Sequence, residues 1–315
     1  MSTGNLSNDA YWLVLQDGRM GTDGQSIGLV EAMGKPHIKY NLKLSWWQRL
    51  LPPRWASKFV AAELAQSFNQ RPPVGIIGAG RRAAYGLLAA KRLWPHIQTV
   101  QIQNPKVNPL AFDVVIAPQH DALVGANVIQ TLGGLHNLTD DKLAAASVHW
   151  QSRLAAFPSP RVAVLIGGNN KHFVLTEKWM DDLSVQLKKL HASGHVLWIT
   201  ISRRTPPVLA ARLQNQLSAE NIFFWDGQGD NPYHAFLARA DFILVTSDSV
   251  SMISESLFTD KPVALLRMPG HSTKFDRFYH ALIAQGYTNW FNGSWSILQR
   301  PRLRETQRVA ALIGK

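Results

Sequence analysis

Short apolar, β-rich runs alternate along the chain with longer stretches of helical hydrophobic periodicity. In the first half this pattern predicts strands at Trp12–Gln16, Val74–Ile77, Thr99–Ile102, Val114–Ala117 and Val128–Thr131. It predicts helices at Gln25–Met33, Ala56–Gln70, Arg82–Arg92 and Asp140–Ala156. Strands that alternate with helices are typical of α/β units built on a parallel sheet.

The second half repeats this alternation after Phe157-Pro158-Ser159-Pro160, whose prolines end a helix and restart extended chain. Its predicted strands are Val162–Ile166, His195–Ile201, Ile222–Trp225, Phe242–Thr246 and Val263–Leu266. Its predicted helices are Thr176–Ser193, Pro206–Leu217, Asn231–Ala238, Ser251–Phe258, Ser272–Gln285 and Leu303–Ile313. We therefore expect two doubly wound domains, residues 1–157 and 158–299, that face each other across a cleft at the carboxyl ends of their sheets, where ligands of such folds bind.

Composition narrows the class of protein. A chain of 315 residues with 46% hydrophobic content is larger than most single cores, which agrees with two domains. No apolar run is long enough to span a bilayer and residues 1–10 lack the features of a signal peptide, so we expect a cytoplasmic protein. The absence of cysteine excludes disulfides, thiolate metal ligands and a cysteine nucleophile.

Positive charge is concentrated in one region. Residues 32–112 contain twelve Lys and Arg residues and one acid, Glu63, so they carry +11 of the net charge of +12. This region includes a cluster of indole and guanidinium groups: Trp46, Trp47, Arg49, Arg54 and Trp55. Indoles favour the headgroup zone of a bilayer and arginines attract anionic lipid, so we expect an anionic membrane surface as partner rather than nucleic acid. Stacking on single-stranded nucleic acid and packing of a loop on its own domain are the other interpretations.

The segment Ala240–Glu255 predicts a site for a nucleotide diphosphate. It reads as a buried strand, a loop of small hydroxylated residues and a helix with a carboxylate in its first turns. Helix-start N–H groups and hydroxyls can hold phosphate, although the same serines could merely cap the helix. Local chemistry alone leaves both readings open.

Further turns in the second half could serve the same ligand. Gly167, Gly168 and Asn169 follow one predicted strand and could admit a phosphate close to the backbone. Arg203 and Arg204 end the next strand, and their guanidinium forks match anionic oxygens. Lys274, in a late loop, could also reach donor phosphates. Each of these turns could instead be a loop with solvated charge.

In the first half, polar groups also follow predicted strands. Asp17 or Asp23 could deprotonate an acceptor hydroxyl, or could only shape a turn and cap a helix. The turn Gly78-Ala79-Gly80-Arg81-Arg82 favours an anion-binding arginine pair over a dinucleotide site, because no acid follows about 20 positions later. The pair His120-Asp121 could be an acid–base unit or a structural strand-end pair. The candidate acceptor-binding residues are Arg19, Gln25, Arg81, Arg82, His120 and Asp121.

No HExxH, EF-hand or Walker pattern occurs, so we expect no metal and no cofactor.

Taken in order, these motifs resemble the Elm-type family, which is named for plant proteins of mitochondrial fission and includes bacterial proteins regarded as glycosyltransferases of lipopolysaccharide or lipooligosaccharide core. The motifs that carry the resemblance are Gln16–Gly21 with Gln25, Gly78–Arg82, Pro118–Asp121, Ile166–Asn169, Ser202–Pro206 and Thr246–Met252. The resemblance implies a GT-B fold, with two Rossmann-like domains and a last helix, about residues 300–315, that crosses back to the first domain.

The resemblance also implies roles for residues. Segment 240–255 is similar to the donor-binding segment of the lipid-linked GlcNAc transferase of peptidoglycan synthesis, which implies that Glu255 binds the ribose hydroxyls. It further implies a set of residues around the donor diphosphate: Thr246, Ser247, Ser249 and Ser251. Asp248, in the same loop, is a further candidate donor-binding residue. Asp23 is the nearest counterpart of the catalytic base of heptosyltransferases, with Asp17 as the alternative.

The chain is thus expected to be a metal-independent, inverting glycosyltransferase on the cytoplasmic face of the inner membrane. It would move a sugar from a nucleotide-sugar to a lipid-linked saccharide of lipooligosaccharide core. The alternatives are a non-catalytic membrane adaptor on a GT-B scaffold and a nucleotide-sugar epimerase.

Overall fold

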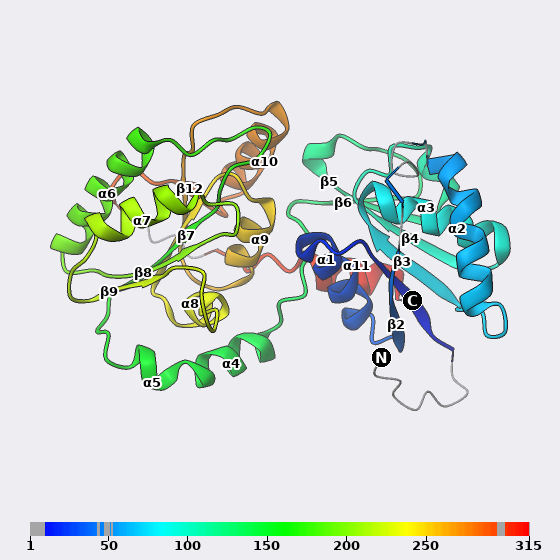
Figure 1. The fold of residues 1–315 in the computed structure, drawn as a ribbon, viewed down its shortest axis with the longest axis horizontal. Coiled ribbons are helices and arrows are strands. Elements are labelled where there is room, and N and C mark those ends of the chain that lie inside the picture. Colours follow the sequence, from blue (N-terminus) through cyan, green and yellow to red (C-terminus); the bar gives the residue numbers. More distant parts are fainter. Residues whose placement is uncertain (1–9, 43–44, 47–50, 52, 295–299, 315) are drawn as a thin grey trace. The chain divides into compact units, whose positions relative to one another are not determined.

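The computed structural model describes residues 10–42, 45–46, 51, 53–294 and 300–314. Internal contacts divide the chain into two units: residues 1–137 with 304–315 form unit 1, and residues 138–303 form unit 2. Each unit contains one six-stranded sheet in which every strand pair is parallel (Figure 1). The expected α/β class with two Rossmann-like halves is therefore confirmed.

Unit 1 has the strand order β2-β1-β3-β4-β5-β6. Its strands are β1 (Trp12–Gln16), β2 (His37–Asn41), β3 (Gly75–Ala79), β4 (Gln98–Ile102), β5 (Val114–Pro118) and β6 (Val128–Thr131). Its helices are α1 (Met20–Ala32), α2 (Pro53–Phe68), α3 (Gly80–Leu93), α11 (Glu305–Ile313) and the 3₁₀ turns η1 (Pro109–Ala111) and η2 (Gln119–Asp121). Side chains alternate between the faces of a strand, so Leu13 and Leu15 pack with α2 and α3, whereas Trp12 and Val14 pack with α1 and α11.

Unit 2 has the strand order β12-β11-β10-β7-β8-β9. Its strands are β7 (Arg161–Ile166), β8 (Val196–Ile201), β9 (Ile222–Trp225), β10 (Phe242–Thr246), β11 (Val263–Leu266) and β12 (Asn289–Trp290). Its helices are α4 (Asp140–His149), α5 (Gln151–Leu154), α6 (Glu177–Ala192), α7 (Pro207–Gln216), α8 (Tyr233–Arg239), α9 (Val250–Phe258) and α10 (Thr273–Ala284). Val162 and Val164 face the core beneath α6 and α7, while Trp198 stacks on Phe236 of α8 with ring centroids 5.3 Å apart.

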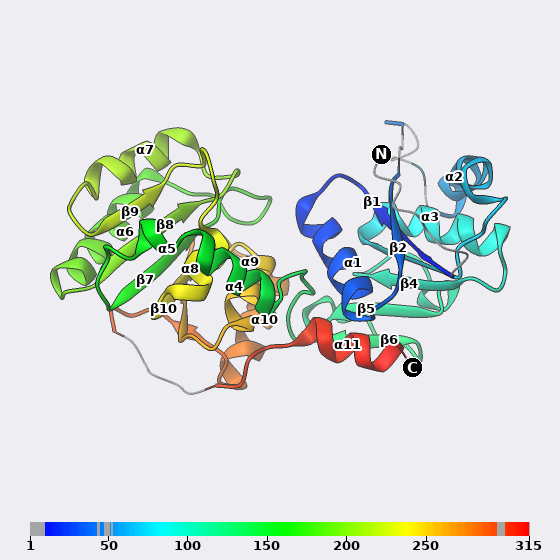
Figure 2. The same cartoon turned by 90° about the horizontal axis from the view of Figure 1, so that it is seen from below.

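The division between the units lies earlier than the predicted boundary at residue 157. Helices α4 and α5 belong to unit 2, where α4 packs along α8 (Figure 2). Arg239 of α8 donates to the Ser147 hydroxyl at 3.1 Å, and Trp150 meets Phe223 edge to face. Pro158 and Pro160 do end the helical region. They do not separate the units, because the helices before them, α4 and α5, pack within unit 2.

Candidate functional site

Both sheets have a switch point, where the chain leaves two neighbouring strands in opposite directions. It lies between β1 and β3 in unit 1 and between β7 and β10 in unit 2. In doubly wound folds this point opens a crevice at the carboxyl ends of the strands, and ligands bind there. The predicted site residues that follow β1, β3, β7 and β10 therefore stand at the expected place within each unit.

A buried carboxylate joins three loops of unit 2. Asp248 accepts hydrogen bonds from the N–H of Gly168 at 3.0 Å, from Nη2 of Arg204 at 2.7 Å and from the Thr246 hydroxyl at 2.6 Å. The Asp248 side chain is 0% exposed and that of Arg204 is 42% exposed. We call Gly167, Gly168, Arg204, Thr246 and Asp248 the Asp248 cluster. Asp248 and Arg204 thus bind each other and hold these loops together, while their contact with a donor stays a prediction.

The two glycines of this cluster are required by close packing. A Cβ on Gly167 would lie 2.0 Å from Oδ1 of Asp248, and a Cβ on Gly168 would lie 2.1 Å from the carbonyl carbon of Arg204. The Thr205 hydroxyl donates to the carbonyl oxygen of Gly167 at 2.6 Å. Glycine at both positions therefore lets the neighbouring loops pack closely, while contact of these residues with a donor phosphate stays a prediction. Asn169 likewise serves the loop, since its Oδ1 accepts from the N–H of Leu175 at 2.7 Å.

Helix α9 begins directly after the Asp248 cluster. Ser249 is its N-cap and accepts from the N–H of Met252 at 3.3 Å, while the Ser247 hydroxyl accepts from the N–H of Met268 at 3.1 Å. Ser249 thus caps α9, whereas Ser247 connects the loop to the segment after β11. The first N–H groups of a helix lack intrahelical acceptors, so this end of α9 suits an anion.

Three further predicted donor residues are accessible. Arg203 is exposed after β8, Ser251 is half-buried in the first turn of α9, and Lys274 is exposed in the first turn of α10. Arg203 differs from its neighbour Arg204, whose guanidinium is engaged with Asp248. Of the two arginines, Arg203 is thus the better candidate for a leaving diphosphate.

Glu255 lies in the second turn of α9 and is half-buried. Its Oε2 accepts a hydrogen bond from the Tyr233 hydroxyl of α8 at 2.6 Å. Burial raises the pKa of Glu255 from 4.5 to about 7, and the hydrogen bond from Tyr233 partly offsets that rise. A carboxylate in this place can accept hydrogen bonds from a diol, which is the chemistry of a ribose.

In unit 1 the two candidate bases lie together. The N–H of Asp17 donates to Oδ1 of Asp23 at 3.0 Å, while Oδ1 of Asp17 accepts from the Thr22 hydroxyl at 3.1 Å. Asp23 is in the first turn of α1, which begins at Met20, earlier than predicted. Burial raises the pKa of Asp23 above its usual 3.8; the hydrogen bond from the backbone of Asp17 lowers it and the charge of Asp17 raises it. A raised pKa brings a carboxylate closer to the range that suits a general base.

Guanidinium groups surround Asp17. Its Oδ2 lies 3.7 Å from Nη1 of Arg82 and 3.7 Å from Nε of Arg19. Gly80, with a φ of 80°, places the start of α3 beside this loop, since a Cβ there would lie 3.7 Å from Thr22. We call Asp17, Arg19, Thr22, Asp23 and Arg82 the Asp17 cluster. With its oxygens engaged in this way, Asp17 is the weaker candidate for the base.

The other predicted acceptor residues are more dispersed. Gln25 is buried and accepts from Nε2 of Gln103 at 3.2 Å. Arg81 donates to the carbonyl oxygen of Leu51 at 3.3 Å, away from its neighbour Arg82. His120 is buried and Asp121 half-buried in η2, after β5. Because β4 separates β5 from β3, this pair lies outside the Asp17 cluster.

The structure describes only some of the residues that are predicted to contact a membrane. Trp46 and Trp55 are 75% and 66% exposed, and Arg54 is in the first turn of α2. Trp47 and Arg49 lie outside the described residues. Within the described part of the chain, no helix combines the length and the apolarity that crossing a bilayer requires.

The same part of the chain holds no group of three or more His, Asp or Glu side chains arranged to hold a metal ion.

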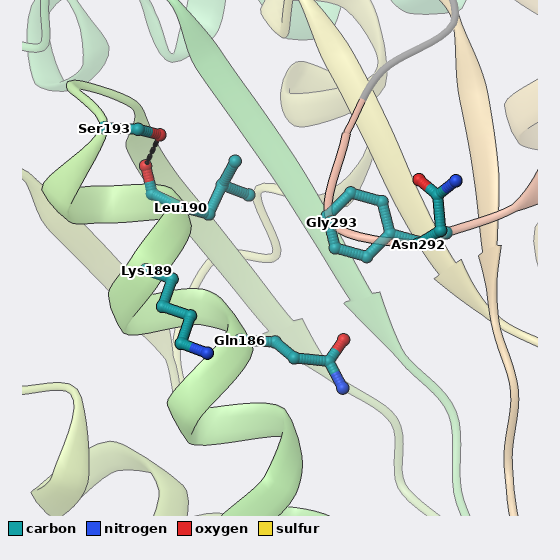
Figure 3. Close-up of a pocket in the computed structure, with 7 residues that line it drawn as sticks. Gln186, Lys189, Leu190, Ser193, Asn292 and Gly293 are labelled. Carbon is teal, nitrogen blue, oxygen red and sulfur yellow. Dashed lines mark hydrogen bonds between the residues drawn. The ribbon is translucent and has the colours of Figure 1, made fainter.

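A hollow of about 470 Å³ in unit 2 does not coincide with these clusters (Figure 3). Helix α6 and the segment after β12 form it, with Lys189, Gln186 and Asn292 among its lining residues. None of its lining residues comes from the loops after β7, β8 or β10. It therefore adds no group to the loops that are predicted to bind the donor.

Sequence reasoning missed three residues of these sites. Thr22 was part of a turn already singled out, and Gln103 directly follows a predicted strand, so both carried a local signal. Tyr233 carried none, because it is 22 positions from Glu255 and meets it only through the packing of α8.

Solved structures with the same architecture define the class. UDP-GlcNAc 2-epimerase from Methanocaldococcus jannaschii has a TM-score of 0.64 at 12% identity, over 97% of this chain and 99% of that one. MurG from Acinetobacter baumannii has a TM-score of 0.56 at 13% identity, over 97% and 99%. UGT2 from Phytolacca americana, complexed with UDP-2-fluoro-glucose and pterostilbene, has a TM-score of 0.57 at 10% identity, over 97% and 89%. The protein is thus a two-domain Rossmann-like α/β protein with the fold of GT-B glycosyltransferases and epimerases.

Sequence comparison gives the family. The chain belongs to the mitochondrial fission ELM1 family, whose model matches residues 20–315. It is 28% identical to an uncharacterized protein of Rickettsia prowazekii over 95% of this chain and 96% of that protein. It is 29% identical to mitochondrial fission protein ELM1 of Arabidopsis thaliana over 79% of this chain and 65% of the plant protein. The resemblance recognised in the motifs is confirmed.

Proposed function

We propose that the protein is a glycosyltransferase that moves a sugar from a nucleotide-sugar to a lipid-linked saccharide. The expected setting is assembly of lipopolysaccharide or lipooligosaccharide core at the cytoplasmic face of the inner membrane. The observation that carries the proposal is the start of α9 at the switch point of unit 2, with Glu255 one turn further along the same helix. The N–H groups at the helix start can bind the diphosphate, and the carboxylate of Glu255 can accept hydrogen bonds from the ribose hydroxyls. One helix can therefore bind both parts of a nucleotide.

The proposed chemistry divides between residues of the two units. Asp23 deprotonates the acceptor hydroxyl, which then attacks the anomeric carbon as the bond to the diphosphate breaks. Arg203 and the N–H groups at the start of α9 stabilise the negative charge that grows on the leaving diphosphate. The Asp248 cluster holds these groups in place before the donor binds. Attack from the face opposite the diphosphate inverts the anomeric carbon.

Nucleotide binding tests the donor site. Calorimetry with UDP, GDP, CMP and ADP should show binding of at least one of them, and Glu255→Gln should weaken that binding about 10-fold or more, since hydrogen bonds to a charged group contribute about 1.5–3 kcal/mol. Glu63→Gln is the matched control, because Glu63 of unit 1 also accepts from a tyrosine hydroxyl at 2.6 Å. If the parent protein binds none of the four nucleotides, the glycosyltransferase and epimerase proposals both fail.

Kinetics tests the base. Asp23→Asn should lower turnover about 100-fold or more while leaving the nucleotide affinity unchanged, because a general base contributes to the chemical step. Asp182→Asn on the exposed face of α6 is the control. Full turnover by Asp23→Asn would overturn the assignment of Asp23.

Charge and exposed indoles support membrane docking. Residues 32–112 carry +11, and Trp46 and Trp55 expose apolar surface in that region. Vesicles containing phosphatidylglycerol should sediment the parent protein, and Trp55→Ala should reduce the bound fraction several-fold. Leu110→Ala, another exposed apolar side chain of unit 1, should not. Equal binding by both variants would argue against this surface.

The adaptor alternative draws its support from the name of the Arabidopsis relative, a mitochondrial fission protein. Vesicle binding without any nucleotide binding would favour it. The epimerase alternative rests on the shared fold of the Methanocaldococcus jannaschii enzyme. Interconversion of a nucleotide-sugar in the absence of any acceptor would favour an epimerase over a transferase.

A further inference from the structure

We propose that Tyr233 is a positioning residue that orients Glu255 for a ribose diol and keeps it ionised in the bound state. This inference rests on the proposed nucleotide site and adds a residue that neither the motifs nor the resemblance indicated. Tyr233 begins α8, and its hydroxyl donates to Oε2 of Glu255 at 2.6 Å. A single strong donor on one carboxylate oxygen fixes the plane of the group and leaves acceptor capacity on the other oxygen.

The position of Tyr233 is itself fixed by the fold. Its N–H donates to Oδ1 of Asn231 at 2.9 Å, which holds the turn into α8. The following residues Ala235, Phe236 and Leu237 are fully buried in the core of unit 2. The hydroxyl therefore reaches Glu255 from a helix that cannot shift without disturbing this core.

The charged groups near Tyr233 and Glu255 indicate that Tyr233 controls the ionisation of Glu255. Burial raises the pKa of Glu255 to about 7, so near neutral pH its ionisation depends on small contributions. On α8, His234 faces Lys142 of α4, and Arg239 donates to Ser147. Within α9, Glu255 is the only charged residue. Among the described residues, the hydrogen bond from Tyr233 is thus the interaction that favours the carboxylate form of Glu255.

Tyr233→Phe tests the inference, because it removes one hydroxyl and keeps the ring. For the parent protein, UDP affinity should rise as the pH rises through about 7, since the ribose hydroxyls donate to a carboxylate. In Tyr233→Phe the midpoint of this rise should move to higher pH, so that UDP affinity falls about 10-fold at pH 7 and recovers by pH 9. The carboxyl carbon of Glu255, followed by ¹³C NMR and assigned with Glu255→Gln, should show the same upward shift.

Tyr40→Phe is the matched control. Tyr40 of unit 1 donates to Oε1 of Glu63 at 2.6 Å, so this variant loses the same kind of hydrogen bond away from the nucleotide site. Its UDP affinity should equal that of the parent at every pH. A loss in Tyr233→Phe that is the same at pH 7 and pH 9, or an unchanged pKa of Glu255, would overturn the positioning role. If the parent binds none of UDP, GDP, CMP and ADP, the proposed nucleotide site is instead overturned, and the NMR titration tells the two failures apart.

Discussion

The Asp17 and Asp248 clusters occupy equivalent places in the two units but are held together in different ways. In unit 2, Asp248 connects residues that are distant in sequence, Gly168 and Arg204, through hydrogen bonds of 3.0 and 2.7 Å. In unit 1, Asp17 bonds to Thr22 and to the N–H of Arg19 within its own turn, and its ion pair with Arg82 is longer, at 3.7 Å.

This difference shows how each unit prepares its site. A carboxylate that links distant loops fixes all of them at once, and removing it leaves a buried gap among donors that water cannot fully satisfy. A carboxylate that bonds within its own turn mainly determines the shape of that turn. We infer that the loops of the Asp248 cluster are ordered as one body, whereas the turn of unit 1 is ordered locally.

Removal of each carboxylate should give the largest contrast. Asp248→Asn should lower the free energy of unfolding by about 2–4 kcal/mol, because it leaves Arg204 and the Gly168 N–H without a buried anion. Asp17→Asn should cost about 1 kcal/mol, the value of a replaceable hydrogen bond. Urea denaturation followed by circular dichroism measures both. Equal losses of unfolding free energy in the two variants would show that both carboxylates stabilise their units to the same extent.

Filling the space of a glycine should give the next largest effect. Gly167→Ala places a Cβ 2.0 Å from Oδ1 of Asp248, so the loop must move, at a cost of about 1–3 kcal/mol. Gly24→Ala in α1 is the control: its Cβ would meet Asn137 at 3.8 Å, and alanine should stabilise the helix by up to about 1 kcal/mol. Thermal unfolding should therefore shift in opposite directions, and a tolerated Gly167→Ala would contradict the tight packing of the Asp248 cluster.

Much of the fold follows from local sequence. The strands β1, β6, β9, β10 and β11 have the predicted bounds, because each is a short segment with β-branched, leucine or aromatic residues between turn signals. The strands β2 and β12 were missed, since the sequence HIKYN of β2 contains no apolar run and β12 is only two residues long. Helix α1 begins at Met20 rather than Gln25, because its first turn is held by backbone contacts of Arg19 and not by a side-chain cap.

The candidate sites were predictable in position but not in role. Parallel strands bring their carboxyl ends to one edge, so the loops after β1, β3, β7 and β10 could be placed from sequence. Which polar groups bind each other depends on distances that sequence does not contain. The 2.7 Å contact between Asp248 and Arg204, for example, became visible only in the folded chain, and their predicted contact with a ligand stays a prediction.

The smallest expected effect concerns two carboxyl groups whose pKa values are shifted in opposite directions. Burial raises the pKa of Glu255 to about 7. Burial also raises the pKa of Asp113 in unit 1, but hydrogen bonds from Lys91 and Thr99 outweigh this and hold that pKa below 3.8. The folded state of Glu255 retains a proton that the unfolded chain loses, so its contribution to stability falls as the pH rises from about 4.5 to about 7. Asp113 stabilises the fold above the pKa of the unfolded chain, and this contribution is lost as the pH falls below about 4.

Replacing each carboxyl group by its amide should therefore give opposite results. Glu255→Gln should match the parent near pH 4.5 and exceed it by about 1–2 kcal/mol at pH 8, because the amide removes a buried charge. Asp113→Asn should be less stable than the parent at pH 8, with a difference that shrinks as the pH falls below 4. Urea denaturation midpoints at pH 4, 5, 6, 7 and 8 measure both trends. A gain in stability by Glu255→Gln together with its loss of nucleotide binding would show that unit 2 keeps a destabilising carboxyl group for its ligand, whereas a loss of stability at pH 8 would mean that Glu255 is a structural partner of Tyr233 alone.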